Sequence, residues 1–197
     1  MRPGKQAGNA GARLFVRAIF GAGVWLSASA QVLPPEAQRA GATWLLKDCD
    51  LHDQDQLGPV LRMFKPQFET FFLNALNNGP TPQLLMDAQT AASKEFDLRQ
   101  QALRSGKGLG LSDADLQAAR KITREQYLEQ AADDFTISYK SRAVSGLGVV
   151  AGDAGKAALQ ALAADPKSPL QGSAQQALIQ LQTASRQNAG PGGRRVP

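Results

Sequence analysis

Cysteine and histidine are nearly absent from this chain, whose 197 residues include one of each. A single cysteine cannot form a disulfide within the chain, so no internal disulfide framework supports the fold. A single histidine excludes metal sites built from several imidazole ligands. Long apolar runs are also missing, because no segment reaches the roughly 20 apolar residues that a membrane-spanning helix requires. The length allows one domain with or without terminal extensions.

Acidic residues are missing from residues 1–30, which carry Arg2, Lys5, Arg13 and Arg17. The net charge of +5 is therefore largely an N-terminal property, since residues 31–185 carry 15 basic and 17 acidic side chains. A nucleic-acid-binding domain gathers positive charge on one face to neutralise phosphates. The balanced charge of the central chain argues against a nucleic-acid partner.

Residues 1–30 have the pattern of a secretory signal peptide. A positively charged segment precedes the apolar run 18–26, and Ala28 and Ala30 are the small residues that signal peptidase requires. We expect cleavage between Ala30 and Gln31, and a periplasmic or secreted bacterial protein with no stable membrane span. An uncleaved anchor and a cytosolic tail are the alternatives, but the apolar run is too short for a spanning helix.

Residues 31–183 lack the alternation of β-branched residues that marks strands, and apolar residues recur instead at helical spacing. The pattern predicts an all-α domain, an antiparallel array of about seven or eight helices. Residues 184–197 have no apolar period and contain two prolines, so we expect a disordered tail. The expected helices cover approximately 36–49, 56–64, 66–76, 82–105, 112–121, 124–147, 153–164 and 169–183. Pro59 suits the first turn of the second of these helices. Ser112 with Asp115, and Thr123 with Gln126, have the spacing of capping boxes that open the fifth and sixth.

The C-terminal end of this domain contains a repeat. Two short helices flank an Asp165-Pro166 turn, and the second helix carries small and apolar residues at helical spacing. Ala143 and Leu147 anticipate this pattern, because they precede Ala174 and Leu178 by 31 residues. The apolar positions of the pair are Leu159, Leu162, Leu170, Ala174, Ala177, Leu178 and Leu181.

Segment 143–181 resembles a HEAT-type repeat of the short, 30-residue form, and its helix pair covers 152–183. The resemblance implies that the helices stack on their neighbours, with Leu178 facing a layer shared with Leu147 and Leu159. It also implies a scaffold for protein interactions, although fold alone does not fix function. Gln171 stands where such repeats often carry an arginine, which suits a terminal repeat. Residues 31–140 resemble no family.

One stretch, 48–55, combines side chains that bind metals. Cys49 and His52 are three residues apart with aspartates nearby, but a structural zinc site needs four ligands. The spacing also fails the pattern of a calcium-binding loop. A helix end followed by the acidic first turn of the next helix explains the same residues. We interpret Cys49 as a small buried residue, with an intermolecular disulfide as the alternative.

Two other patterns lack the context that their chemistry requires. The glycine-rich segment 106–110 has no strand before it and no Ser or Thr after Lys107, so it is interpreted as a linker rather than a phosphate loop. Glu125, Glu129 and Asp133 recur every four residues among basic side chains. That spacing predicts a solvated helix face rather than paired acid–base carboxylates.

We therefore assign no catalytic, cofactor-binding or metal-binding residue, and expect neither an enzyme nor a cofactor. The leading interpretation is an exported, non-enzymatic helical protein that binds or helps assemble another protein in the bacterial envelope. The alternative is an exported protein that binds a small ligand or a metal.

Overall fold

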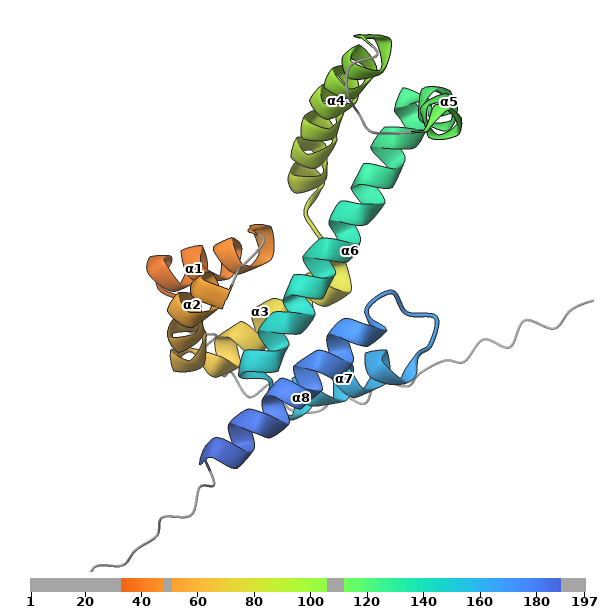
Figure 1. The fold of residues 1–197 in the computed structure, drawn as a ribbon. Helices are drawn as coiled ribbons and strands as arrows, with labels where there is room; N and C mark the ends of the chain where they lie inside the picture. The colour runs from red at the N-terminus through yellow and green to blue at the C-terminus, as the bar shows by residue number, and fades with distance from the viewer. Residues whose placement is uncertain (1–32, 48–50, 106–111, 189–197) are drawn as a thin grey trace, which may run out of the picture. The chain divides into compact units, whose positions relative to one another are not determined.

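The computed structural model describes residues 33–47, 51–105 and 112–188, and every regular element in these ranges is an α-helix. This confirms the all-α prediction (Figure 1). None of the described helices is both long and apolar enough to cross a membrane. The helices are α1 (Pro35–Leu46), α2 (Leu51–Met63), α3 (Lys65–Asn78), α4 (Pro82–Ser105), α5 (Asp113–Lys121), α6 (Arg124–Val150), α7 (Asp153–Ala164) and α8 (Gln171–Asn188).

Capping residues place several helix starts where the sequence predicts them. Thr123 opens α6 with a complete capping box, in which its hydroxyl accepts from the Gln126 N–H and the Gln126 side chain accepts from the Thr123 N–H. Ser112 caps α5 by accepting from the Asp115 N–H at 3.2 Å. Each bond satisfies a backbone donor that the first turn of a helix leaves unpaired.

Several boundaries differ from the sequence prediction. Helix α1 ends at Leu46, where Lys47 is extended, instead of near Cys49. Helix α2 begins at Leu51 instead of near Gln56, so Pro59 lies inside the helix rather than in its first turn. Helix α8 continues to Asn188, so the first five residues of the expected tail are helical. The first Gly-Pro pair after the start of α8 is Gly190-Pro191, which lies beyond the end of this helix. The predicted signal peptide, its cleavage site and residues 189–197 lie outside the described residues.

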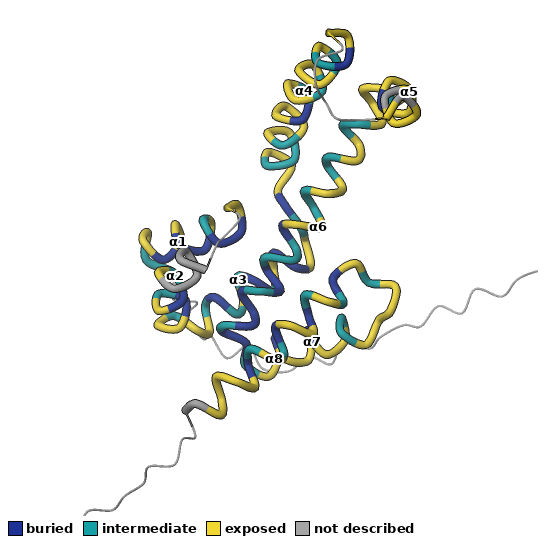
Figure 2. Tube along the Cα trace, viewed as in Figure 1, coloured by how far each residue is buried: buried dark blue, intermediate teal, exposed yellow. Residues whose placement is uncertain are grey.

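Most of the core lies between α3, α6 and the helices packed on them. We call α1–α3, α7, α8 and residues 139–150 of α6 the body. Helix α3 packs extensively on α6, and α6 in turn packs on α8. Phe68 and Phe72 of α3 are fully buried, and the Phe72 ring contacts Trp44 of α1 at a centroid distance of 6.3 Å. The buried stretches of these helices face one another in Figure 2.

Hydrogen bonds between distant residues join the helices of the body. The Trp44 indole N–H donates to the Arg142 carbonyl at 2.9 Å, and the Arg142 guanidinium donates to the Leu45 carbonyl at 3.1 Å. Glu69 of α3 accepts from the backbone N–H groups of Gly152 and Gly155 at 2.9 and 2.7 Å. Because Gly152 has no side chain to cap α7, the carboxylate of α3 caps that helix instead.

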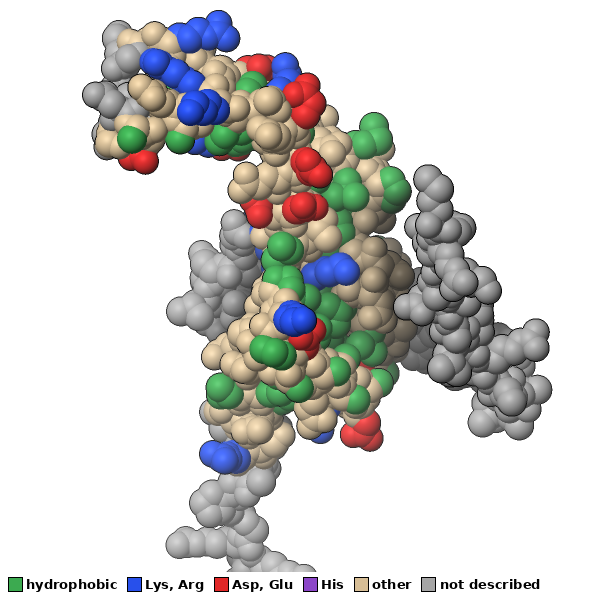
Figure 3. Space-filling model, turned by 90° about the vertical axis from the view of Figure 1, so that its right-hand side faces the viewer, with side chains coloured by type: hydrophobic (Ala, Val, Ile, Leu, Met, Phe, Trp, Pro, Cys, Tyr) green, Lys and Arg blue, Asp and Glu red, His purple; other side chains and the backbone are tan. Residues whose placement is uncertain are grey.

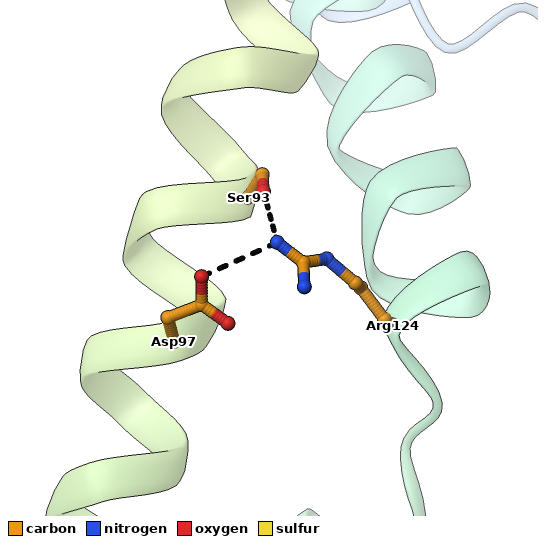
Figure 4. A network of polar contacts seen from close by, with 3 residues as sticks. All are labelled: Ser93, Asp97 and Arg124. Atoms are coloured by element: carbon orange, nitrogen blue, oxygen red, sulfur yellow. Dashed lines mark hydrogen bonds and ion pairs between the residues drawn. The ribbon is translucent and has the colours of Figure 1, made fainter.

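Residues 86–135, which we call the α4–α5 region, are packed differently. Among its described side chains, only Ala92, Leu103 and Ala119 are buried. Polar contacts join α4 to the start of α6, where the Arg124 guanidinium donates to Ser93 and pairs with Asp97 at 3.2 Å (Figure 4). Both partners of the ion pair are largely exposed, so solvent screens their attraction.

Candidate binding groove

Helices α6 and α8 pack side by side in the same direction. The hydroxyls of Ser141 and Ser173 lie 2.8 Å apart, and further along both helices Gly148 lies against Ala177. A Cβ added to Gly148 would meet the Ala177 backbone at 3.1 Å, so the absence of a side chain permits this close approach. The second contact lies closer than the first to the C-terminal end of each helix, so the two helices are parallel. Helix α7 connects them (Figure 1).

Ala174 and Ala177 are fully or almost fully buried on α8, and Leu181 completes the same stripe. The sequence prediction for Leu178 needs correction, because this residue is only half-buried and packs at the edge of the core. A position one residue after Ala177 is rotated by about 100° from it on an α-helix, which places Leu178 on the flank of the stripe. Leu147 and Leu159 are fully buried, as expected.

A cleft of about 350 Å³ opens where α1, α2, α3, α6, α7 and α8 come together. Its apolar surface includes Trp44, Val149 and Leu181, and Ser145, Gln180 and Ser185 supply polar groups. Arg62, Lys65 and Lys156 also line it. The volume lies near the lower end of the range of small-ligand pockets, roughly 300–1,000 Å³.

A second cleft, of about 360 Å³, lies between α7 and α8. It shares Lys156, Leu181 and Ser185 with the first cleft, so the two form a continuous depression that we call the α8 groove. The second cleft adds Leu178 and Arg186, together with the amides of Gln160 and Gln182. The groove thus combines an apolar floor with hydrogen-bonding groups and cationic side chains.

The remaining surface offers scattered apolar residues. On the face shown in Figure 3, hydrophobic side chains reach the surface in small groups between polar and charged ones. The largest exposed fractions among apolar residues belong to Met63, Leu98 and Met86, which come from two different helices. Isolated residues of this kind are normal on soluble proteins.

The candidate residues of the sequence analysis lie away from the groove or outside the described side chains. Glu125, Glu129 and Asp133 are exposed on α6, as predicted for a solvated face. Cys49 is outside the described residues, His52 belongs to α2 without a described side chain, and the linker 106–110 is not described. Among the described residues, no three His, Cys, Asp or Glu side chains are grouped so that they could hold a metal ion.

Two tyrosines have shifted pKa values, and neither lines the groove. Burial raises the pKa of Tyr139 above its usual value near 10. Burial also raises the pKa of Tyr127, and the nearby Glu95 carboxylate adds to this effect while Arg99 opposes it. Tyr139 is buried and the Tyr127 ring contacts Phe96, so both act as packing residues.

The geometry defines a groove that basic side chains line. Comparison with protein-family models, with curated proteins and with solved structures finds no match for this chain. The groove and the sequence are therefore the basis on which a function is proposed below.

No local pattern in the sequence predicts the groove. Its residues come from six helices, and Arg62 and Lys156 are separated by most of the domain. Each basic residue taken alone has the sequence context of an ordinary surface residue. The sequence signal that relates to the groove is the 31-residue spacing between Ala143 and Ala174, which suggests that their helices pack together. These helices, α6 and α8, do pack on each other and form one wall of the groove.

Proposed function

We propose that this chain is an exported, non-enzymatic helical scaffold of the bacterial envelope that binds another protein through the α8 groove. The observation that carries the proposal is the continuity of the two clefts along α8, from Trp44 to Arg186. An extended segment of a partner fits such a shape, because its side chains would occupy the apolar floor while its backbone meets the groove amides and hydroxyls.

The parallel packing of α6 and α8 supports the proposed HEAT-type repeat. Helices at equivalent positions of successive repeats run in the same direction, and α7 then serves as the first helix of the last repeat. In this interpretation α8 is the last helix of the described array, where it packs on α6 and α7. Ile179 of α8 is 55% exposed, consistent with an uncovered face.

Export is proposed from the N-terminal sequence alone. Intact-mass analysis of the protein purified from envelope fractions should give a chain that begins at Gln31. A protein that still begins at Met1 would reject the cleaved signal.

Partner binding is tested by photo-crosslinking from inside the groove. A benzophenone amino acid at Gln182, which lines the groove, should capture a defined partner, whereas the same probe at Gln89 of α4 should not. Both positions are exposed. Equal labelling from the two positions would reject a groove-specific partner.

A steric variant gives a matched control for the same experiment. Ser185 lines both clefts, while Thr183 lies two residues away on α8 and lines neither. Their hydroxyls both bond to the carbonyl four residues earlier, and both residues are exposed. Ser185→Trp should abolish the crosslink and Thr183→Trp should leave it. Retention of the crosslink in Ser185→Trp would place the partner elsewhere.

A further inference from the structure

The charges that line the α8 groove all have one sign. Four basic side chains reach it from four helices: Arg62 from α2, Lys65 from α3, Lys156 from α7 and Arg186 from α8. No Asp or Glu is among the described residues that line either cleft. This contrasts with residues 31–185 as a whole, where acidic side chains outnumber basic ones.

These four cations are not neutralised within the described part of the chain, where none of them has a carboxylate within ion-pair distance. Glu69 lies near the start of α7, but its carboxylate already accepts two backbone N–H groups. Asp153, in the first turn of α7, does not line the groove. The Arg62 guanidinium folds along α2, 3.3 Å from where a Cβ on Gly58 would lie. A side chain at position 58 would press against it.

The geometry points to an acidic segment of the partner protein as the occupant of the groove, an inference that rests on the proposed function. Carboxylates of such a segment would pair with the basic side chains, and an apolar residue between them would contact the floor near Trp44 and Leu181. Bound carboxylates would supply the negative charges that the groove lining lacks.

The chain's own termini do not suit this role. Residues 1–32 and 189–197 carry arginine and lysine and no acidic residue, so the cations of the groove would repel them. The acidic stretch 48–55 has the opposite charge, and the experiment below includes it as a competing occupant.

The test measures binding of a fluorescein-labelled peptide, EELEELEE, to the purified chain by anisotropy. The peptides QQLQQLQQ and KKLKKLKK serve as neutral and basic controls. We expect the acidic peptide to bind at least about tenfold more tightly than either control. Its affinity should fall as salt rises from about 50 to about 300 mM, because screening weakens partly exposed charge pairs. Equal binding of the neutral peptide would overturn the inference.

Two double variants with the same loss of charge locate the binding site. Arg62→Ser with Lys156→Ser removes two cations from the groove, and Arg194→Ser with Arg195→Ser removes two from the C-terminal tail. The groove variant should weaken binding by about tenfold or more, and the tail variant by less than about twofold. Circular dichroism and melting temperature verify that both remain folded. Equal weakening in the two variants would show that net charge, rather than the groove, attracts the peptide.

Two further outcomes would overturn the proposal. The first is measured in a variant with Asp48, Asp50, Asp53 and Asp55 replaced by Asn. If this variant binds the peptide more than about tenfold more tightly than the wild type, the chain's own acidic stretch is the occupant of the groove. A single-stranded DNA 12-mer that binds more tightly than EELEELEE, and loses affinity in the Arg62→Ser, Lys156→Ser variant, would indicate phosphate recognition. Two results support an acidic segment of the partner. The peptide affinity of the Asp→Asn variant should equal that of the wild type, and the DNA should bind more weakly than EELEELEE.

The two proposals fail in different ways. If the Gln182 crosslink persists but EELEELEE does not bind, the partner uses the groove without acidic residues and this inference fails alone. If EELEELEE binds in the groove but no partner is crosslinked there, the proposed function fails and the preference for carboxylates remains as a property of the groove.

Discussion

The body and the α4–α5 region are both helical, but they differ in how many of their side chains are buried. In the body, Phe68 and Phe72 are completely buried and belong to one continuous cluster that spans the helices. In the α4–α5 region, the described buried residues are Ala92, Leu103 and Ala119. Helix length does not account for this difference, since α4 has 24 residues and α3 has 14. Tertiary burial, rather than helix length, sets local stability.

The largest expected effect comes from the aromatic cluster of the body. Phe72→Ala should lower the free energy of unfolding by about 3–5 kcal/mol, because it removes a fully buried ring that contacts Trp44 and Phe68. Phe96→Ala in the α4–α5 region should cost less, about 1–2 kcal/mol, since Phe96 is only half-buried against Tyr127. Urea unfolding measures both variants. Equal losses would mean that the two regions are equally well packed.

The second prediction concerns the packing of α3 on α6. A Cβ on Gly146 would lie 2.5 Å from the Phe72 ring, so Gly146→Ala should destabilise the body by about 1–3 kcal/mol through overpacking. Gly172→Ala is the matched control, since no atom lies within 4 Å of its added Cβ. This control should be neutral or stabilise α8 by up to about 1 kcal/mol. Equal changes in melting temperature in the two variants would contradict the close approach at Gly146.

A smaller effect is expected where α3 caps α7. Glu69→Ala should cost about 1–2 kcal/mol, because the N–H groups of Gly152 and Gly155 lose their acceptor. Glu69→Gln keeps an oxygen acceptor and should cost less. Hydrogen exchange at these two amides should accelerate in Glu69→Ala, while the Thr123 and Gln126 amides at the capped start of α6 stay unchanged. Uniform acceleration would indicate global destabilisation instead of a lost cap.

The smallest effect belongs to the surface of the α4–α5 region. Arg124→Ala should change the free energy of unfolding by no more than about 1 kcal/mol, because its ion pair with Asp97 is exposed. The difference from the wild type should shrink further at high salt. Thermal melts at low and high salt measure it. A loss comparable to that of Phe72→Ala would show that polar contacts, rather than packing, hold this region.

The sequence predicted the features that depend on neighbouring residues. The capping box at Thr123 and the cap at Ser112 were identified because the donor and acceptor are three residues apart. The spacing between Ala143 and Ala174 predicted that their helices would be neighbours, and both residues are fully buried. Helix α8 continues beyond the end of its apolar periodicity, so the periodicity alone predicts an end that is too early.

The features that the sequence did not reveal depend on residues far apart in the chain. The cap on α7 comes from Glu69, which is 83 residues before Gly152. Leu178 has the same helical spacing from Ala174 as a core residue would have, and only the packing of α8 on α6 and α7 places it at the edge of the core. The groove combines side chains from six helices, and no local pattern specifies how those helices converge.

The hydrogen bonds that join α1 to Arg142 of α6 also have a kinetic consequence. The residues they join are 97 and 98 positions apart, whereas helical proteins often fold quickly through contacts between neighbours along the chain. Docking of α1 on α6 closes a loop of 97 residues, and the entropy lost in that closure opposes an early docking of α1. A chain synthesised only as far as α5 has several helices but lacks α6, on which α1, α3 and α4 pack in the folded protein.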